Sequence, residues 1–358
     1  MTEPHQTAPH PPQPTVIAQA HGGLGWLTLN RPRAINALDL DMIGQLAGAL
    51  DRWEHDPDVD LVVLDGAGDR GFCAGGDVRS LYDQITSGHA DDTAAFFLAE
   101  YALNARIAEY PKTVVALADG ITMGGGIGLA GHAAIRVVTE RSKLAMPETR
   151  IGFTPDVGGT WLLGRAPGRI GEYLGVTGAT MDAADAIYAG FADHLVPSDR
   201  LDAVREALQT RTDPPTPTGI VLLFEEMPAP SRLEGARAWI DDAFAADTVA
   251  EIVQRLRARD EPKASATADV MSELSPTGMA VTLEAVRRAR RLPDLRAALA
   301  QEYGLVQWFG HTQPDLVEGI RAQLVDKDRN PRWNPATPDA IESVAAAFAH
   351  VPPVPLWG

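Results

Sequence analysis

One stretch of the sequence, residues 112–165, constrains the possible fold more than any other. It opens with an apolar, β-branched run at 113–117, which predicts a buried parallel strand. A glycine run, Gly124 to Gly126, comes after a turn and leads into small residues. A glycine run that enters a helix can bring bare backbone N–H groups, at the positive end of the helix dipole, against an anion. The stretch therefore predicts a strand, an anion-binding turn and a helix in succession.

Strands and helices alternate through the rest of the N-terminal half. Apolar runs at 15–20 and 24–29 flank a His-Gly-Gly turn and predict a hairpin, and 61–64 predicts another buried strand. A helix is expected behind Asp39 as its N-cap, and a second helix at 92–109. The apolar face of the first helix comprises Leu40, Ile43, Leu46, Leu50 and Trp53. This alternation implies an α/β fold with a mainly parallel sheet and crossover helices.

The pattern becomes helical beyond Gly164. Helices are expected at 169–176, 181–189 and 201–209, and a proline-rich break at 213–217 indicates a boundary. The residues beyond this break carry few strand signals. Three regions are therefore expected: a disordered proline-rich tail at 1–14, an α/β core at 15–212 and a helical C-terminal region at 213–358.

Charge and composition exclude several classes of protein. The net charge is −17, from 48 acidic and 31 basic residues, which argues against a nucleic-acid or anionic-membrane partner. No apolar run reaches the roughly 18 residues of a membrane span. The single cysteine, Cys73, excludes an internal disulfide and, with an N-terminus unlike a signal peptide, favours the cytoplasm. Neither HExxH nor CxxC spacing occurs, so no metal site is expected.

Two glycine turns are candidate binding features. The loop 71–77 comes after the strand at 61–64, and its turn could aim the Ala74 N–H at a ligand oxygen, with Asp77 near the next helix. The alternative is an ordinary β-to-α turn that needs glycine for its dihedral angles. Cys73 fits a small buried residue better than a nucleophile. Paired with Gly124–Gly126, the loop suits an oxyanion hole, in which each N–H donor contributes on the order of 3 kcal/mol.

The second glycine turn also has a competing interpretation. Residues 126–131 match the GxGxxG pattern of dinucleotide-binding loops. In such loops the first glycine directly follows the strand, whereas here the strand is expected to end near Leu117. Nucleotide binding is therefore disfavoured.

Glu148 and Asp156 are the candidate catalytic acids. Each follows a proline, and Gly158-Gly159 then opens an expected helix, so the backbone between them is constrained. Apolar neighbours would desolvate a carboxylate and raise its pKa toward that of a useful general base. Two surface acids in an acidic protein are the plainer alternative. No GxSxG pattern occurs, which argues against an α/β-hydrolase.

These segments resemble the crotonase (enoyl-CoA hydratase/isomerase) superfamily and, within it, the 3-hydroxyisobutyryl-CoA hydrolase family. The resemblance runs from about Thr15 to about Ala336. General superfamily marks lie at 30–38, 72–77 and 123–126. More specific marks lie at 145–149 and 155–159 and in the C-terminal segments 275–277, 318–322, 326–328 and 331–333.

The resemblance implies a spiral of ββα turns with a helical C-terminal region and an acyl-CoA ligand. The thioester oxygen would lie between the N–H groups of Ala74 and Gly125, and Glu100 would line the substrate pocket. Glu148 would activate water or attack the thioester to form an anhydride, and Asp156 would bind the 3-hydroxyl group. Coenzyme A would contact Arg31, Arg33, Ala74, Gly76 and Asp77. From the residues alone, the two arginines could equally be solvated side chains.

Two departures from the hydratases favour hydrolysis over hydration. The first of their two glutamates falls at Gly128 here, and Asp156 replaces a glycine. The expected activity is hydrolysis of a short branched 3-hydroxyacyl-CoA, most simply 3-hydroxyisobutyryl-CoA, in valine breakdown. The alternatives are an enoyl-CoA hydratase or isomerase and a non-catalytic acyl-CoA-binding protein. No cofactor is expected, since coenzyme A is part of the substrate, and the chain is either a trimer-type homo-oligomer or a monomer.

Overall fold

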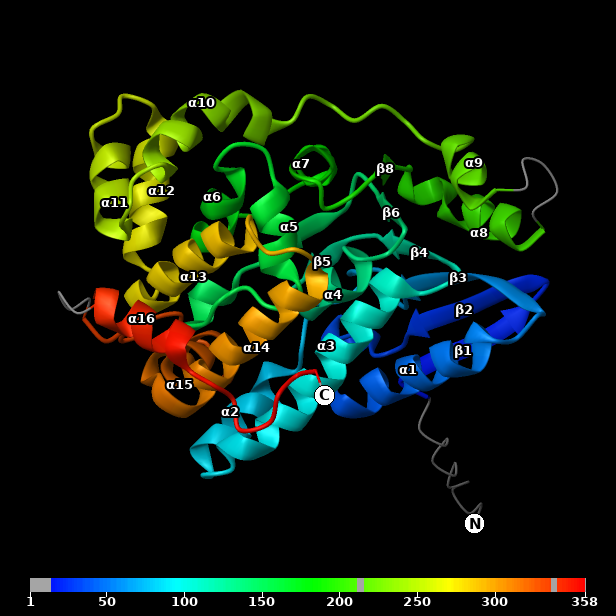
Figure 1. The fold of residues 1–358 in the computed structure, drawn as a ribbon. Coiled ribbons are helices and arrows are strands. Elements are labelled where there is room, and N and C mark those ends of the chain that lie inside the picture. The colour runs from blue at the N-terminus through cyan, green and yellow to red at the C-terminus, as the bar shows by residue number, and fades with distance from the viewer. Residues whose placement is uncertain (1–13, 211–215, 336–339, 358) are drawn as a thin grey trace, which may run out of the picture.

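The computed structural model describes residues 14–210, 216–335 and 340–357 (Figure 1). The strands are β1 (Val16–His21), β2 (Gly23–Leu29), β3 (Val59–Gly66), β4 (Thr113–Ala118), β5 (Ile121–Met123), β6 (Ile135–Val138), β7 (Lys143–Ala145) and β8 (His194–Leu195). The helices of the first part are α1 (Leu40–Glu54), α2 (Val78–Thr86), α3 (Thr93–Glu109), α4 (Gly125–Ala130), α5 (Gly159–Arg165), α6 (Ile170–Thr177), α7 (Ala183–Ala189) and α8 (Leu201–Thr210). Those of the second part are α9 (Pro217–Leu222), α10 (Arg232–Phe244), α11 (Val249–Arg257), α12 (Pro262–Ser272), α13 (Pro276–Ala289), α14 (Leu295–Thr312), α15 (Pro314–Ile320) and α16 (Ala340–Ala349).

The main sheet has the strand order β1-β2-β3-β4-β6-β8. Strand β1 pairs with β2 in an antiparallel hairpin, and every other pair in the sheet is parallel, with helices between successive strands. A second, two-stranded parallel sheet joins β5 to β7. The predicted α/β class and the first hairpin are therefore confirmed. Strands β5 to β8 were not predicted, because runs of two to four residues carry too little periodicity.

Helix α1 begins where the sequence predicted, because the Asp39 side chain accepts a hydrogen bond from the Met42 N–H at 2.9 Å. Ile43, Leu46, Leu50 and Trp53 are buried, as expected. Leu40 was also expected on the buried face, and that prediction is wrong. Its side chain is 48% exposed, because it lies in the first turn at the wall of an open cavity rather than against the sheet.

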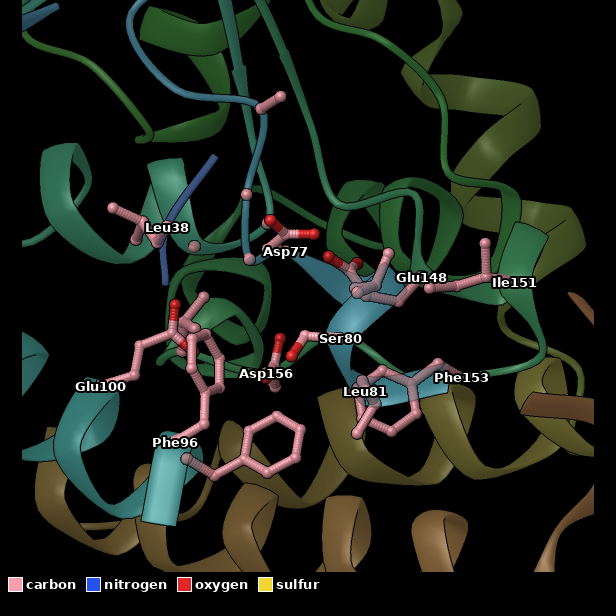
Figure 2. A pocket seen from close by; sticks show the side chains of 18 of the residues that line it. Leu38, Asp77, Ser80, Leu81, Phe96, Glu100, Glu148, Ile151, Phe153 and Asp156 are labelled. Atoms are coloured by element: carbon pink, nitrogen blue, oxygen red, sulfur yellow. The ribbon is translucent and has the colours of Figure 1, made fainter. Parts of the chain in front are cut away.

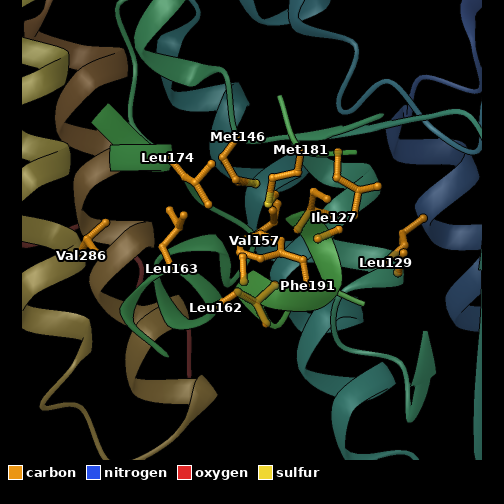
Figure 3. Packing of buried hydrophobic residues seen from close by; sticks show 14 of the residues in the cluster. Ile127, Leu129, Met146, Val157, Leu162, Leu163, Leu174, Met181, Phe191 and Val286 are labelled. Atoms are coloured by element: carbon orange, nitrogen blue, oxygen red, sulfur yellow. The ribbon is translucent and has the colours of Figure 1, made fainter. Parts of the chain in front are cut away.

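Helices α10 to α16 share one apolar cluster with the first part of the chain. Figure 3 shows Leu163 of α5 and Leu174 of α6 on the side that faces Val286 of α13. Helix α14 packs against α3 and α5. The C-terminal region thus covers the elements that come after Glu148 in the sequence.

Some predictions fall on residues outside the described ranges. These are residues 1–13 of the expected tail and residues 213–215 of the proline-rich break, which include the expected boundary. Both features stay predictions. In the ranges that the structure describes, no helix is both long enough and apolar enough to cross a membrane.

Candidate active site

A cavity of about 360 Å³ opens beside the two glycine turns (Figure 2). Of the residues singled out in the sequence, it is lined by Ala74, Gly76, Asp77, Glu100, Gly125, Glu148 and Asp156. Its apolar wall includes Leu81, Phe96, Phe97, Ile151 and Phe153. Arg31 and Arg33 are not among the lining residues. The structure therefore brings together both candidate acids and both glycine turns in one space.

The two glycine turns pass close to each other at the cavity wall. Gly75 has φ +106° and Gly124 has φ +48°, conformations that favour glycine. A methyl group added to Gly125 would lie 3.3 Å from the Gly76 nitrogen. Gly125 is the first residue of α4, so its N–H has no partner within the helix. Among the described residues, neither the Gly76 N–H nor the Gly125 N–H finds an acceptor, and the two form a donor pair.

This arrangement corrects the prediction for Ala74. The Ala74 N–H donates to the Ile35 carbonyl oxygen at 2.9 Å and is not free to bind a ligand. The neighbouring bonds, from Leu38 N–H to the Gly75 oxygen and from Asp77 N–H to the Leu38 oxygen, are both 2.8 Å and leave out the Gly76 N–H. The N–H group that is left beside Gly125 therefore belongs to Gly76, two residues after the predicted one.

Glu100 and Glu148 flank the second glycine turn. Glu148 begins a short 3₁₀-helix, Glu148–Ile151, and Glu100 lies on α3; the two residues are 6% and 2% exposed. A methyl group on Gly124 would lie 3.2 Å from Oε1 of Glu148, and one on Gly125 would lie 2.4 Å from Oε1 of Glu100. Within the part of the chain that the structure describes, Glu148 Oε2 and Glu100 Oε1 have no hydrogen-bond partner. In Figure 2 both carboxyl groups lie around the same hollow as Asp156.

Asp156 is held by a residue that the sequence did not indicate. The Tyr101 hydroxyl donates to Asp156 Oδ2 at 2.7 Å, across 55 residues of sequence. Tyr101 follows Glu100 on α3 and is fully buried. A helical period places Tyr101 toward the core, but nothing in the sequence points its hydroxyl group at Asp156.

Burial dominates the electrostatics of the three carboxyl groups. It raises the pKa of Glu148 well above 4.5, and the nearby Asp156 raises it further. Burial also raises the pKa of Glu100, with Asp156 and Glu148 adding to the effect. The pKa of Asp156 is raised to about 7 by burial, against the lowering effect of the Tyr101 hydrogen bond. A carboxylate with a raised pKa is a stronger base than an ordinary one, which suits proton abstraction near neutral pH.

The position of the missing hydratase glutamate has no room for a longer side chain. A methyl group on Gly128 would lie 2.7 Å from Asn104 Nδ2 and 2.8 Å from Val157 Cβ. Gly128 is therefore a packing position in this chain, and Glu148 lacks the acid partner that a residue there would supply.

The remaining sequence candidates have structural explanations. Cys73 is fully buried, and burial raises its thiol pKa to about 12, as expected for a non-nucleophilic cysteine. A methyl group on Gly126 would lie 2.4 Å from the Cys73 carbonyl oxygen, so the first glycine of the GxGxxG match serves packing. Arg31 pairs with Asp39 at 3.1 Å and Asp77 at 3.2 Å, and so braces its loop. Arg33 is exposed, and its phosphate contact stays a prediction, as does that of Arg31.

A comparison with protein families identifies the family of this chain. The profile of the family described as enoyl-CoA hydratase/isomerase matches residues 24–348. The chain belongs to this family. The crotonase resemblance and the crotonase-like fold class are confirmed.

Similar proteins carry different activities. The mitochondrial 3-hydroxyisobutyryl-CoA hydrolase of Gallus gallus is 39% identical over 93% of this chain and 87% of its own length. A solved carnitinyl-CoA dehydratase from Mycobacterium thermoresistibile is 46% identical, with a TM-score of 0.89, over 95% of this chain and 98% of that one. An enoyl-CoA hydratase from Rhodobacter sphaeroides 2.4.1 is 42% identical, with a TM-score of 0.87, over 94% and 98%. The fold is shared, so the geometry of the site has to discriminate among these chemistries.

Proposed function

We propose that this chain hydrolyses a short branched 3-hydroxyacyl-CoA thioester, with 3-hydroxyisobutyryl-CoA as its best substrate. The observation that carries the proposal is the buried carboxyl group of Glu148 beside the N–H groups of Gly76 and Gly125; among the described residues, Glu148 Oε2 and both N–H groups have no hydrogen-bond partner. The crowded Gly128 position supports hydrolysis over hydration. The activity named for the Gallus gallus relative agrees with it.

In the proposed reaction the thioester carbonyl oxygen accepts hydrogen bonds from Gly76 and Gly125. Glu148 takes a proton from a water molecule that attacks the carbonyl carbon, or it attacks that carbon itself to form an anhydride that water then opens. The two N–H groups stabilise the tetrahedral oxyanion, each by about 3 kcal/mol. The carbon–sulfur bond then breaks, and the leaving thiolate takes up a proton. Both routes consume one water and yield the acid and coenzyme A thiol.

Free-thiol release from a panel of acyl-CoA thioesters tests the proposal. We expect 3-hydroxyisobutyryl-CoA to be hydrolysed with the highest kcat/KM, isobutyryl-CoA more slowly, and crotonyl-CoA to be hydrated weakly or not at all. Rapid hydration of crotonyl-CoA without thiol release would instead identify a hydratase. Binding of acyl-CoA without turnover of any substrate would identify a non-catalytic binding protein.

Hydration is the second candidate because of one specific observation. Glu100 places a buried carboxyl group next to Gly125, and so could stand in for the acid missing at Gly128. The activities named for the two similar solved structures belong to this class. The thioester panel separates the candidates, because hydration leaves the carbon–sulfur bond intact.

We assign Asp156 to the 3-hydroxyl group of the substrate. Asp156→Asn keeps the size of the side chain and an oxygen acceptor for Tyr101. We expect kcat/KM to fall about tenfold to hundredfold for 3-hydroxyisobutyryl-CoA and much less for isobutyryl-CoA, because a site built to bind a hydroxyl group loses that contact. Steady-state kinetics on both substrates measures the difference. Equal losses on the two substrates would contradict the assignment.

The pH profile should report the raised carboxyl pKa values. Glu148 acts as a base or nucleophile only when ionised, and its pKa lies well above 4.5. Activity should therefore fall as the pH drops, with the acid limb of log kcat/KM centred well above 4.5. Measurements of kcat/KM from about pH 4 to 9 give the midpoint. A limb at or below 4.5 would show that the essential carboxylate is an ordinary, solvated one.

Three further features are proposals. We propose a cytoplasmic location, although the Gallus gallus relative is mitochondrial by name, and a role in valine breakdown. The third feature is the oligomeric state, a trimer-type homo-oligomer or a monomer. Cell fractionation and growth on valine as carbon source test these two. Sedimentation velocity distinguishes a trimer from a monomer.

A further inference from the structure

The turn that carries Asp156 has an unusual backbone. Val157 has φ +54°, a left-handed conformation that β-branched residues rarely adopt, and Gly158 comes next with φ +77°. The Val157 side chain is 1% exposed and packs among the apolar residues drawn in Figure 3. Such a conformation persists only where surrounding contacts hold it.

A carboxyl group from the C-terminal region makes three hydrogen bonds to the residues just after Val157. Glu302 Oε2 accepts from the Gly158 N–H at 2.6 Å, and Oε1 accepts from the Thr160 N–H at 2.8 Å and from the Thr160 hydroxyl group. These bonds span about 140 residues of sequence and connect α14 to the start of α5. Gly158 is the N-cap residue of α5 and has no side chain of its own to cap the helix. On its other side, His132 Nε2 donates to the Val157 carbonyl oxygen at 2.8 Å.

Glu302 is a costly residue at this place. It is fully buried and pairs with no arginine or lysine among the described residues. Burial raises its pKa to about 8, and nearby Asp156 also raises the pKa, while the bonds from Thr160 and Gly158 lower it. A buried carboxyl group without a cation stabilises a fold only through the donors that it satisfies. Here those donors belong to the residues immediately after Asp156.

We propose that Glu302 is a positioning residue, which fixes the turn 155–159 so that Asp156 faces the 3-hydroxyl group of the substrate. The inference rests on the proposed function. It means that the hydroxyl selectivity of the site depends on a helix outside the α/β core.

Glu302→Gln is the sharpest probe. Both oxygens of a carboxyl group can accept hydrogen bonds in either protonation state, whereas the amide nitrogen of glutamine cannot accept one. One backbone N–H of the turn therefore loses its partner while the side-chain size is unchanged. Glu172→Gln is the matched control. Glu172 is equally buried, but it pairs with Arg169, the N-cap residue of α6, and with Arg290, the C-cap residue of α13, and it is not among the residues lining the site.

The measured quantity is selectivity, the ratio of kcat/KM for 3-hydroxyisobutyryl-CoA to kcat/KM for isobutyryl-CoA. We expect Glu302→Gln to lower this ratio about tenfold and Glu302→Asp to lower it less. Glu172→Gln should lower Tm and leave the selectivity ratio unchanged. Because both residues act through one contact, adding Glu302→Gln to Asp156→Asn should lower the ratio no further. If Glu302→Gln does not fold, Thr160→Val removes the hydroxyl donor alone and should lower the ratio less, in the same direction.

The outcomes separate this inference from the proposed function. A wild-type ratio in Glu302→Gln or in Thr160→Val, while Asp156→Asn loses it, overturns the inference alone. A further fall in the double variant overturns it as well. A wild-type protein that releases no thiol overturns the proposed function and this inference with it.

Discussion

Glu148→Gln should reduce thiol release from 3-hydroxyisobutyryl-CoA by about a thousandfold or more, whichever of the two routes operates. The amide can neither take a proton from water nor attack the thioester carbon. Substrate binding should survive, since the change keeps the size of the side chain and the N–H groups of Gly76 and Gly125 are unaffected. Single-turnover thiol release and equilibrium binding of the acyl-CoA measure the two quantities separately.

The same variant has a predictable effect on stability. The pKa of Glu148 is raised in the folded state, so the folded protein binds more protons than the unfolded chain between the two pKa values. The free energy of unfolding that Glu148 contributes therefore falls as the pH rises above about 4.5. Glu148→Gln should be more stable than wild type at pH 8, and the difference should shrink toward pH 5.

Thiol release within tenfold of wild type, in a folded variant, would remove Glu148 from the mechanism.

Gly125→Ala should lower kcat by about a hundredfold or more. The new methyl group would lie 2.4 Å from Glu100 Oε1 and 3.3 Å from the Gly76 nitrogen, between the donor pair and one of the site carboxyl groups. The Glu100 carboxyl is the end of a flexible side chain, so the fold can adjust, but the space for the thioester oxygen is filled. The loss of one oxyanion-hole donor typically costs 10²- to 10³-fold. Steady-state kinetics and thermal unfolding together check both parts.

A matched glycine controls for the substitution itself. Gly235 lies exposed on α10, and a methyl group there meets nothing within 4 Å. Gly235→Ala should leave kcat unchanged and stabilise the helix by about 1 kcal/mol. Full activity in Gly125→Ala would contradict the placement of the oxyanion hole at that turn.

The sequence predicted which residues share the cavity more accurately than it predicted which N–H groups are free in it. Glu148 and Asp156 could be selected because each follows a proline in a glycine-limited segment, and such local signals are visible in one sequence. The error at Ala74 arose because the direction of each N–H in a loop depends on the hydrogen bonds it makes, here to Ile35. Tyr101 and Glu302 could not be selected, since their bonds to the Asp156 turn cross 55 and about 140 residues.

In the fold, too, the sequence predicted the elements that depend on local patterns and missed those that depend on contacts between distant residues. The strand β4 and the helix α3 were predicted to within a residue or two, because long apolar periodicities determine them. The short strands β5 and β7 form only where the chain returns to pair with itself. The exposure of Leu40 likewise depends on the cavity that forms around it, which no helical pattern describes.

A crystal structure of Glu148→Gln with 3-hydroxyisobutyryl-CoA bound tests the central claim most directly. We predict the thioester oxygen at about 2.7–3.1 Å from the nitrogens of both Gly76 and Gly125, with the side chain at position 148 facing the carbonyl carbon. A thioester oxygen turned away from both amides, or a carbonyl carbon out of reach of position 148, would contradict the account.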